Sequence, residues 1–268
     1  MRSRPTALFV TDGETISPTE LSRGPWDPTA CHGGSVSALL VRAIEAAPDG
    51  GAGWQLARVT IELSRPVPLA PLMVDAEVVR PGRKVALVEA RLVRASDRVE
   101  VARARALRIR RAAIPLPEHP AVALEQPFGV PGHGAALPSP FIGEQLAFHS
   151  DGCELRFAGG AFVEPGPVQV WIRLKVPVLD GEEPSGAQRA IAAADFGNGV
   201  SGALPSEHYL YINPDLTIHL LRPPVGEWIG LDSRSHYGPE GAGLAESALY
   251  DEHGRVGHSV QSLFVDER

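Results

Sequence analysis

The first part of the chain carries one helical pattern of apolar residues, followed by four patterns typical of strands. Apolar residues recur at the spacing of one helix face in SVSALLVRAIEAA (35–47), after Gly33-Gly34 and before Pro48. Four runs rich in β-branched residues come next and are divided by Pro, Gly or polar turns: ARVTIELSRPV, PLMVDAEVVRPG, KVALVEARLVRAS and VEVARARALRIR. The patterns predict one helix and then an antiparallel meander.

The second part of the chain repeats this order. Pro184 occupies a plausible first helical position, apolar residues continue at helical spacing to Ala194, and Gly197 and Gly199 are expected to end the helix. Strand-like runs follow: EHYLYI, LTIHLLRP, EWIGLDSRS, AGLAESALYD and GHSVQSLFV. Further strand-like segments precede each helix, namely ALFVTDG in the first part and CELRFAG and VQVWIRLKV in the second.

The two parts also match residue by residue. A constant offset of 157 positions pairs Thr60-Ile61 with Thr217-Ile218, and the same frame continues without gaps to Arg98-Val99 and Arg255-Val256. Such a frame indicates an internal duplication. We therefore expect an N-terminal repeat over 1–111, a Pro/Gly-rich connector over 112–140 and a C-terminal repeat over 141–268.

One helix followed by several long antiparallel strands favours a sheet that curls around the helix, which is the hotdog arrangement. Two copies in one chain can join their sheets edge to edge and so remove exposed edge strands. The expected fold class is α+β, a double hotdog.

Composition and charge limit the classes of binding partner that we expect. The 268 residues are 44% hydrophobic and carry a net charge of -7, without a cluster of basic residues, which argues against nucleic acid and acidic membranes as partners. No run of eighteen apolar residues occurs, so no membrane insertion is expected, and the N-terminus lacks a secretory pattern. A cytoplasmic location is expected. Cys31 and Cys153 are too few and too far apart to indicate a disulfide framework or a zinc site.

Four motifs, taken together, resemble the acyl-CoA thioesterase II family, and more narrowly its actinobacterial branch. They are GPWDPTACHGGSVSALL (24–40), RPVPLAPLMVDAEVVRPGRKVALVEARL (65–92), AADFGNG (193–199) and HSVQSLFV (258–265). The resemblance implies a double-hotdog fold, a role in fatty acid metabolism and hydrolysis of a fatty acyl-CoA. It also implies no metal or organic cofactor, since coenzyme A is part of the substrate.

The resemblance further implies a set of residues that hold the attacking water: an Asp after the second helix, a Thr on the next strand and a Gln near the C-terminus. These positions fall on Asp195, Asn213 and Gln261. Asn213 departs from the family pattern. An amide can orient water, but it cannot pass a proton as a hydroxyl can.

Each of the three residues also has a structural interpretation. Asp195 follows the end of the second predicted helix, where the helix dipole disfavours a negative charge, although an Asp also suits the turn that begins there. Gln261 interrupts an apolar strand, so a buried amide would need partners, whereas an edge-strand Gln would face water. Asn213 precedes Pro214, and Asn-Pro commonly opens a turn.

The start of the first predicted helix is a candidate oxyanion and substrate-binding site. It reads His32-Gly33-Gly34, and backbone N–H groups at a helix N-terminus face outward with partial positive charge. His32 is a possible second base, or a capping residue. Cys31 beside it raises the weaker possibility of a Cys-His nucleophile. Glycines needed only for tight packing are the structural alternative.

The repeat predicts one reaction centre. At the 157 offset, Leu56 lies opposite Asn213 and Ala104 lies opposite Gln261, and the first predicted helix contains no Asp. Arginines of ARARALRIRR (102–111) could bind coenzyme A phosphates, but alternating charges more often mark a solvated strand face.

Two other functions stay open on sequence grounds. The chain could be a non-catalytic binder of acyl thioesters, or an enoyl-thioester hydratase or dehydratase. Half-apolar outer sheet faces favour a homo-oligomer, a dimer in the simplest case, with an acyl-CoA as the small-molecule partner.

Overall fold

The computed structural model describes residues 4–48, 53–118, 123–129, 145–162 and 164–268. Thirteen strands within these ranges form one sheet, and every strand pair in it is antiparallel. The strands are β1 (Phe9–Asp12), β2 (Thr15–Pro18), β3 (Trp54–Glu62), β4 (Leu72–Arg80), β5 (Val85–Arg94), β6 (Glu100–Arg110), β7 (Cys153–Gly159), β8 (Val168–Leu174), β9 (Tyr209–Ile212), β10 (Asp215–Leu220), β11 (Trp228–Tyr237), β12 (Ala242–Asp251) and β13 (Gly254–Glu267).

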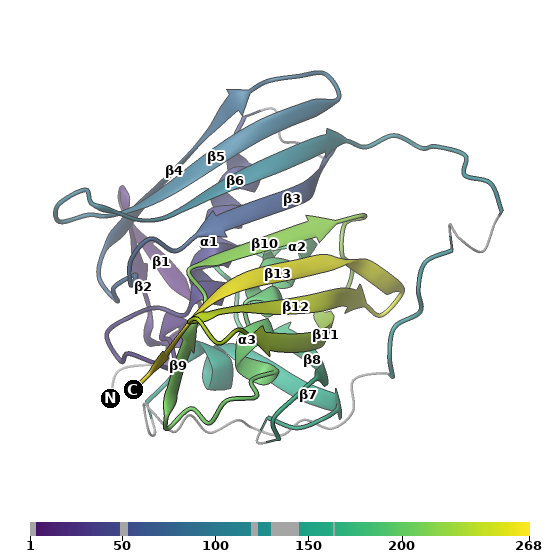
Figure 1. Cartoon of the computed structure of the whole chain (residues 1–268). Helices are drawn as coiled ribbons and strands as arrows, with labels where there is room; N and C mark the ends of the chain where they lie inside the picture. Colours follow the sequence, from purple (N-terminus) through teal and green to yellow (C-terminus); the bar gives the residue numbers. More distant parts are fainter. Residues whose placement is uncertain (1–3, 49–52, 119–122, 130–144, 163) are drawn as a thin grey trace.

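The order of the strands has the mirrored form of a duplicated unit. It runs β1-β2-β4-β5-β6-β3-β10-β13-β12-β11-β8-β7, so the two halves meet where β3 pairs with β10 (Figure 1). The remaining strand, β9, lies off this path and pairs with β13. Thr60 and Thr217 lie directly opposite each other in this pair, and their hydroxyls are 3.1 Å apart. The offset of 157 that joins these two threonines also carries the whole of β5 onto β12. The repeat found in the sequence is therefore a structural repeat around this seam.

Two helices lie side by side against the sheet, one from each half. They are α1 (Gly33–Ala46) and α2 (Gly186–Ala194), which pack against each other behind the central strands (Figure 1). Leu39, Leu40 and Ile44 of α1 are fully buried, and each such side chain contributes about 1.5–3 kcal/mol on burial. Their core is continuous with that of the second half. The fold is a double hotdog, as the helix and strand patterns predict.

The ends of α2 differ from the expectation. Pro184 precedes the helix rather than opening it, because the Ser185 hydroxyl accepts a hydrogen bond from the Gln188 N–H at 3.1 Å and caps α2. Gly197 does not end the helical region but opens the short α3 (Gly197–Val200). A Cβ at Gly197 would lie 2.7 Å from the Ser247 hydroxyl, so the glycine lets α3 approach β12 closely.

Another glycine sets the contact between the two helices. A Cβ at Gly34 would lie 2.7 Å from the carbonyl oxygen of Ala192 and 3.0 Å from the ring of Phe148. The first turn of α1 can therefore sit directly against the last turn of α2. This contact joins the two halves at the place where the predicted site residues gather.

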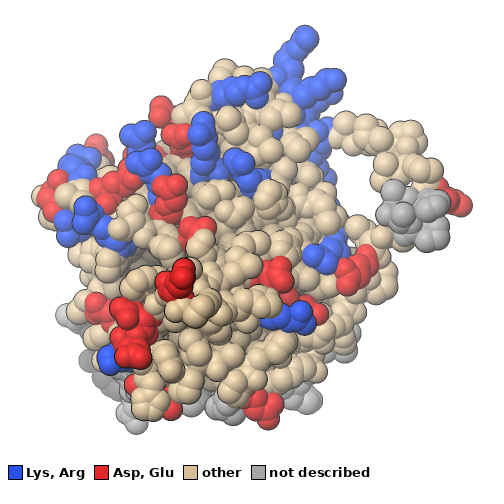
Figure 2. Space-filling view, viewed as in Figure 1, with Lys and Arg blue, Asp and Glu red and all other residues tan. Residues whose placement is uncertain are grey.

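Charges of both signs mix over the N-terminal half. Figure 2 shows Lys and Arg beside Asp and Glu over β4, β5 and β6. Arg103 pairs with Glu100 at 2.7 Å and Arg105 with Glu89 at 3.3 Å, so these arginines belong to a solvated, ion-paired face. No helix among the described residues is long and apolar enough to cross a membrane.

The connector predicted over 112–140 is only partly described. Residues 112–118 and 123–129 form no helix or strand, and the stretches 119–122 and 130–144 lie outside the described residues. Glu125 pairs with Arg255 at 2.8 Å, and the Phe128 ring lies 5.1 Å from that of Trp171. This part of the connector thus packs on the C-terminal half. The boundaries at 111 and 141 stay predictions.

Candidate active site

A cavity of about 500 Å³ opens where the two halves meet. The N-terminal half supplies the segment before α1, the first turn of α1 and the residues after β3. The C-terminal half supplies the end of α2, part of α3 and the link between β9 and β10. The lining residues include Cys31, His32, Gly33, His149, Asp195 and Asn213.

Asp195 is the buried carboxylate among the cavity-lining residues. It follows α2 directly and is 6% exposed. Its Oδ1 accepts a hydrogen bond from Asn213 Nδ2 at 2.8 Å, and its Oδ2 lies 3.0 Å from His32 Nδ1. Two of its neighbours thus come from opposite halves of the duplication. The carboxylate is fixed in one orientation and still has lone pairs free to accept a hydrogen bond from water.

His32 caps α1 and is held tightly. Its ring lies 4.9 Å from the ring of Phe148 and 5.0 Å from that of Phe196. His32 Nδ1 is 3.0 Å from the Gly34 nitrogen as well as 3.0 Å from Asp195 Oδ2. One nitrogen cannot donate to the carboxylate and accept from Gly34 at the same time. The two contacts are therefore alternatives for this nitrogen.

The two glycines at the start of α1 have different places. Gly33 lines the cavity, and a Cβ there would lie 2.8 Å and 2.9 Å from the two carboxylate oxygens of Asp195. As the first residue of α1 it has no acceptor for its N–H within the helix, so that N–H can serve a ligand. The Gly34 N–H instead points to His32 Nδ1, behind the cavity wall. Of the predicted donors, Gly33 is the better placed.

Gln261 stands behind the cavity rather than on its wall. It lies on β13 and is 1% exposed. Its Nε2 donates to the backbone oxygen of Asp195 at 3.3 Å, and its Oε1 accepts from the Asn198 N–H at 3.0 Å. The amide has the partners that its burial requires. It fixes the chain between α2 and α3, and in this way the position of Asp195.

His149 is a cavity residue that sequence reasoning missed. It lies in a π-helical turn at Phe148–Gly152 and is 8% exposed, and neither ring nitrogen has a hydrogen-bond partner. Burial, with a smaller contribution from nearby His32, lowers the pKa of His149 to about 4. A neutral imidazole with an unused N–H therefore lies in the cavity wall, with both ring nitrogens shielded from solvent. No short motif around residue 149 indicates this role, which arises only when the segment folds against α1.

Cys31 lacks the environment of an activated nucleophile. Burial raises the pKa of its thiol, and the side chain is directed to the Pro68 carbonyl oxygen at 3.7 Å. A protonated thiol is a poor nucleophile. Within the described residues, no group of three or more His, Cys, Asp or Glu side chains is placed to hold a metal ion.

Comparison with known families gives a match to both halves. The acyl-CoA thioesterase N-terminal domain matches residues 22–109, and the acyl-CoA thioesterase C-terminal domain matches residues 122–265. A search of curated proteins finds no match.

Solved structures share the fold at low sequence identity. A hot dog fold protein of unknown function from Alicyclobacillus acidocaldarius has a TM-score of 0.67 and 17% identity, covering 96% of this chain and 95% of its own. A proposed thioesterase from Novosphingobium aromaticivorans has a TM-score of 0.67 and 21% identity, with 96% and 98% covered. A proposed thioesterase II from Thermobifida fusca has a TM-score of 0.67 and 17% identity, with 97% and 96% covered.

Proposed function

The chain belongs to the acyl-CoA thioesterase family, and from this premise we propose that it hydrolyses a fatty acyl-CoA to the free acid and coenzyme A. The observation that carries the proposal is the buried Asp195 carboxylate in the cavity between the halves, which accepts a hydrogen bond from Asn213 at 2.8 Å and lies 3.0 Å from His32 Nδ1.

In the proposed reaction Asp195 is the general base. It takes a proton from a water molecule as the water oxygen attacks the thioester carbonyl carbon. The negative charge that develops on the carbonyl oxygen is held by the Gly33 N–H at the start of α1. The carbon–sulfur bond then breaks, and the proton held by Asp195 passes to the departing thiolate. No metal or organic cofactor takes part in this proposal.

Asn213 takes the place of the hydroxyl in the family pattern. Its Nδ2 also donates to the Asp215 carbonyl oxygen at 3.3 Å, so its amide is fixed with the nitrogen toward Asp195. An amide in this position orients the base and needs no proton transfer of its own. Gln261 supports the same carboxylate from behind, through backbone contacts.

His149 adds a second donor toward the oxyanion. With a pKa of about 4 its imidazole is neutral near pH 7, so it keeps one N–H and one lone pair. Both ring nitrogens lack partners within the described chain. A thioester carbonyl that reaches the ring would accept a hydrogen bond from this N–H and so offset the cost of burying it without a partner.

Three readouts on the purified protein separate this proposal from its alternatives. Release of free thiol from a panel of acyl-CoAs supports hydrolysis and also gives the preferred chain length. Reversible addition of water to an enoyl-CoA without thiol release supports a hydratase. Tight binding of an acyl-CoA with neither reaction supports a non-catalytic binder. The cytoplasmic location and the dimer expected from the sequence stay predictions, and sedimentation equilibrium tests the latter.

A further inference from the structure

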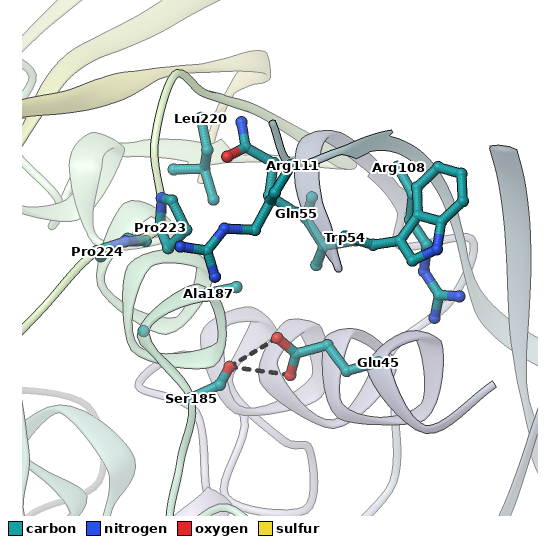
Figure 3. Close-up of a pocket in the computed structure, with 12 residues that line it drawn as sticks. Glu45, Trp54, Gln55, Arg108, Arg111, Ser185, Ala187, Leu220, Pro223 and Pro224 are labelled. Carbon is teal, nitrogen blue, oxygen red and sulfur yellow. Dashed lines mark hydrogen bonds between the residues drawn. The ribbon is translucent and has the colours of Figure 1, made fainter. Parts of the chain in front are cut away.

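A second cavity lies at the opposite end of the helix pair. Its volume is about 300 Å³, and it is formed by the last turn of α1, the first turn of α2 and the ends of β3, β6 and β10 (Figure 3). Leu220 and Pro223 line it, and the offset of 157 relates them to Leu63 and Pro66 of the first cavity. The duplication therefore places this cavity where the counterpart of the first cavity belongs.

In each cavity, a carboxylate at the end of one helix contacts the N-cap residue of the other helix. In the first, Asp195 at the end of α2 contacts His32, the N-cap residue of α1. In the second, Glu45 near the end of α1 accepts from the hydroxyl of Ser185, the N-cap residue of α2, with oxygen–oxygen distances of 2.8 and 2.9 Å (Figure 3). A glycine, Gly33 or Gly186, follows each N-cap residue and lines its cavity.

A side-chain amide completes both arrangements. Asn213 Nδ2 donates to Asp195 at 2.8 Å, and Gln188 Nε2 donates to Glu45 at 2.8 Å. Burial raises the pKa of Glu45 against the opposing hydrogen bonds from Gln188 and Ser185. A carboxylate whose pKa is shifted toward neutrality is a better general base near pH 7.

The sequence predicts a single centre, because the first helix contains no Asp and the counterparts of Asn213 and Gln261 are not polar. Those counterparts, Leu56 and Ala104, are indeed apolar. The second cavity instead uses Glu45, with an amide supplied by α2 itself. Its polar set comes from other positions, so a fixed offset does not find it.

Two arginines distinguish the second cavity. Arg108 is 2% exposed and donates to the carbonyl oxygens of Ile44 and Pro48 at the end of α1. Arg111 is exposed and extends from the strand layer toward α2, above the Glu45–Ser185 pair (Figure 3). The wall is thus more cationic than that of the first cavity, which suits a thioester whose carrier bears phosphates.

We propose that this second cavity is a second thioester hydrolysis site, specific for short-chain acyl-CoAs, with Glu45 as its general base. Glu45 takes a proton from water, the water oxygen attacks the thioester carbon, and the Gly186 N–H at the start of α2 holds the oxyanion. The carbon–sulfur bond breaks and the proton passes from Glu45 to the thiolate. Arg111 binds the carrier phosphates at the mouth. The smaller volume, about 300 against about 500 Å³, selects the shorter acyl chain.

This inference rests on the proposed function, and substrate length separates the two. Asp195→Asn is expected to lower decanoyl-CoA hydrolysis by about 100-fold, within the usual range for loss of a general base, and to leave most butyryl-CoA hydrolysis in place. Glu45→Gln, which keeps a partner for Ser185, is expected to do the reverse. The double variant should lose both activities. A merely structural role for Glu45 would lower both activities together.

Charge reversal at the mouth provides a matched pair of variants. Arg111→Glu should raise the KM for butyryl-CoA at least several-fold and leave decanoyl-CoA unaffected, because a carboxylate there repels phosphates. Arg110→Glu changes the neighbouring exposed residue, which does not line the cavity, and should alter neither.

Every outcome decides the matter. A wild-type protein that releases no thiol from any acyl-CoA overturns both proposals. An active wild type whose Asp195→Asn variant loses butyryl-CoA and decanoyl-CoA hydrolysis equally overturns the second site alone and leaves the proposed function standing. The second site is also overturned if the double variant Asp195→Asn, Glu45→Gln still hydrolyses butyryl-CoA.

Discussion

At the scale of single residues, His149 is buried with no hydrogen-bond partner for either ring nitrogen. Replacing such a group by an apolar one of similar size removes a desolvation cost of about 1–3 kcal/mol. His149→Leu should therefore raise the free energy of unfolding by about 1 kcal/mol at pH 7. The same change should lower kcat/KM by about 100-fold, because it removes a donor to the oxyanion. Urea unfolding and thiol release measure the two effects, and a variant that loses stability and keeps activity would contradict the role.

The pKa of His149 also predicts an acid-sensitive fold. Above the ordinary histidine value of about 6.5 the residue is neutral in both states and contributes nothing to the pH dependence. As the pH falls from about 6.5 to about 4, the unfolded chain takes up a proton that the folded chain resists, so stability decreases by up to about 3 kcal/mol. Unfolding of wild type and His149→Leu over this window should show that the loss is smaller in the variant. Parallel pH curves would refute the assignment.

Single residues also show where sequence reasoning succeeds and where it ends. The motif around Asp195 and the Asn-Pro pair at 213 led to two side chains that meet at 2.8 Å. Gln261 was expected at the cavity and instead holds the backbone behind it. His149 carried no indication, because its burial depends on contacts made by a segment far from both motifs.

At the scale of elements, the close contact between α1 and α2 depends on a glycine. A Cβ at Gly34 would meet a backbone oxygen at 2.7 Å, which cannot swing aside as a side chain can. Gly34→Ala should cost about 1–3 kcal/mol and displace Asp195, with a loss of activity. Gly199→Ala is the comparison, since nothing lies within 4 Å of its Cβ position, and it should be neutral or stabilising by up to about 1 kcal/mol. Equal thermal stability of the two variants would show that the helix contact is looser than described.

Helices and strands were predicted well, but their ends were not. The patterns gave every strand from β3 to β13 and both long helices, since each has an apolar face of the right period. The start of α2 was misplaced because Pro184 and Ser185 are both good N-terminal residues, and only the cap hydrogen bond decides between them.

At the scale of the whole molecule, the duplication predicts that the halves hold together without a covalent link. Their contacts include the β3–β10 pair, the α1–α2 pair and backbone bonds of 3.0 Å from Leu8 and Phe9 to the C-terminal half. A protease site inserted between Leu116 and Pro117, where Leu116 is 67% exposed, should give two fragments that elute as one species and keep activity. Fragments that separate in gel filtration would show that the connector is essential to the pairing.

The overall architecture was open to prediction because duplication leaves a constant offset in the sequence. The seam falls on Thr60 and Thr217, the same pair that first revealed the repeat. The reciprocal use of Glu45 and Ser185 was not open to prediction, since it appears only when the two helices lie antiparallel and each one's last turn meets the other's first.

The central claim, that Asp195 in the cavity between the halves activates the attacking water, is tested most directly by the rate of decanoyl-CoA hydrolysis in Asp195→Asn. The variant keeps the size of the side chain and removes the base, so kcat/KM should fall at least about 100-fold while circular dichroism shows an intact fold. A folded variant that hydrolyses decanoyl-CoA within a few-fold of the wild-type rate would contradict the claim.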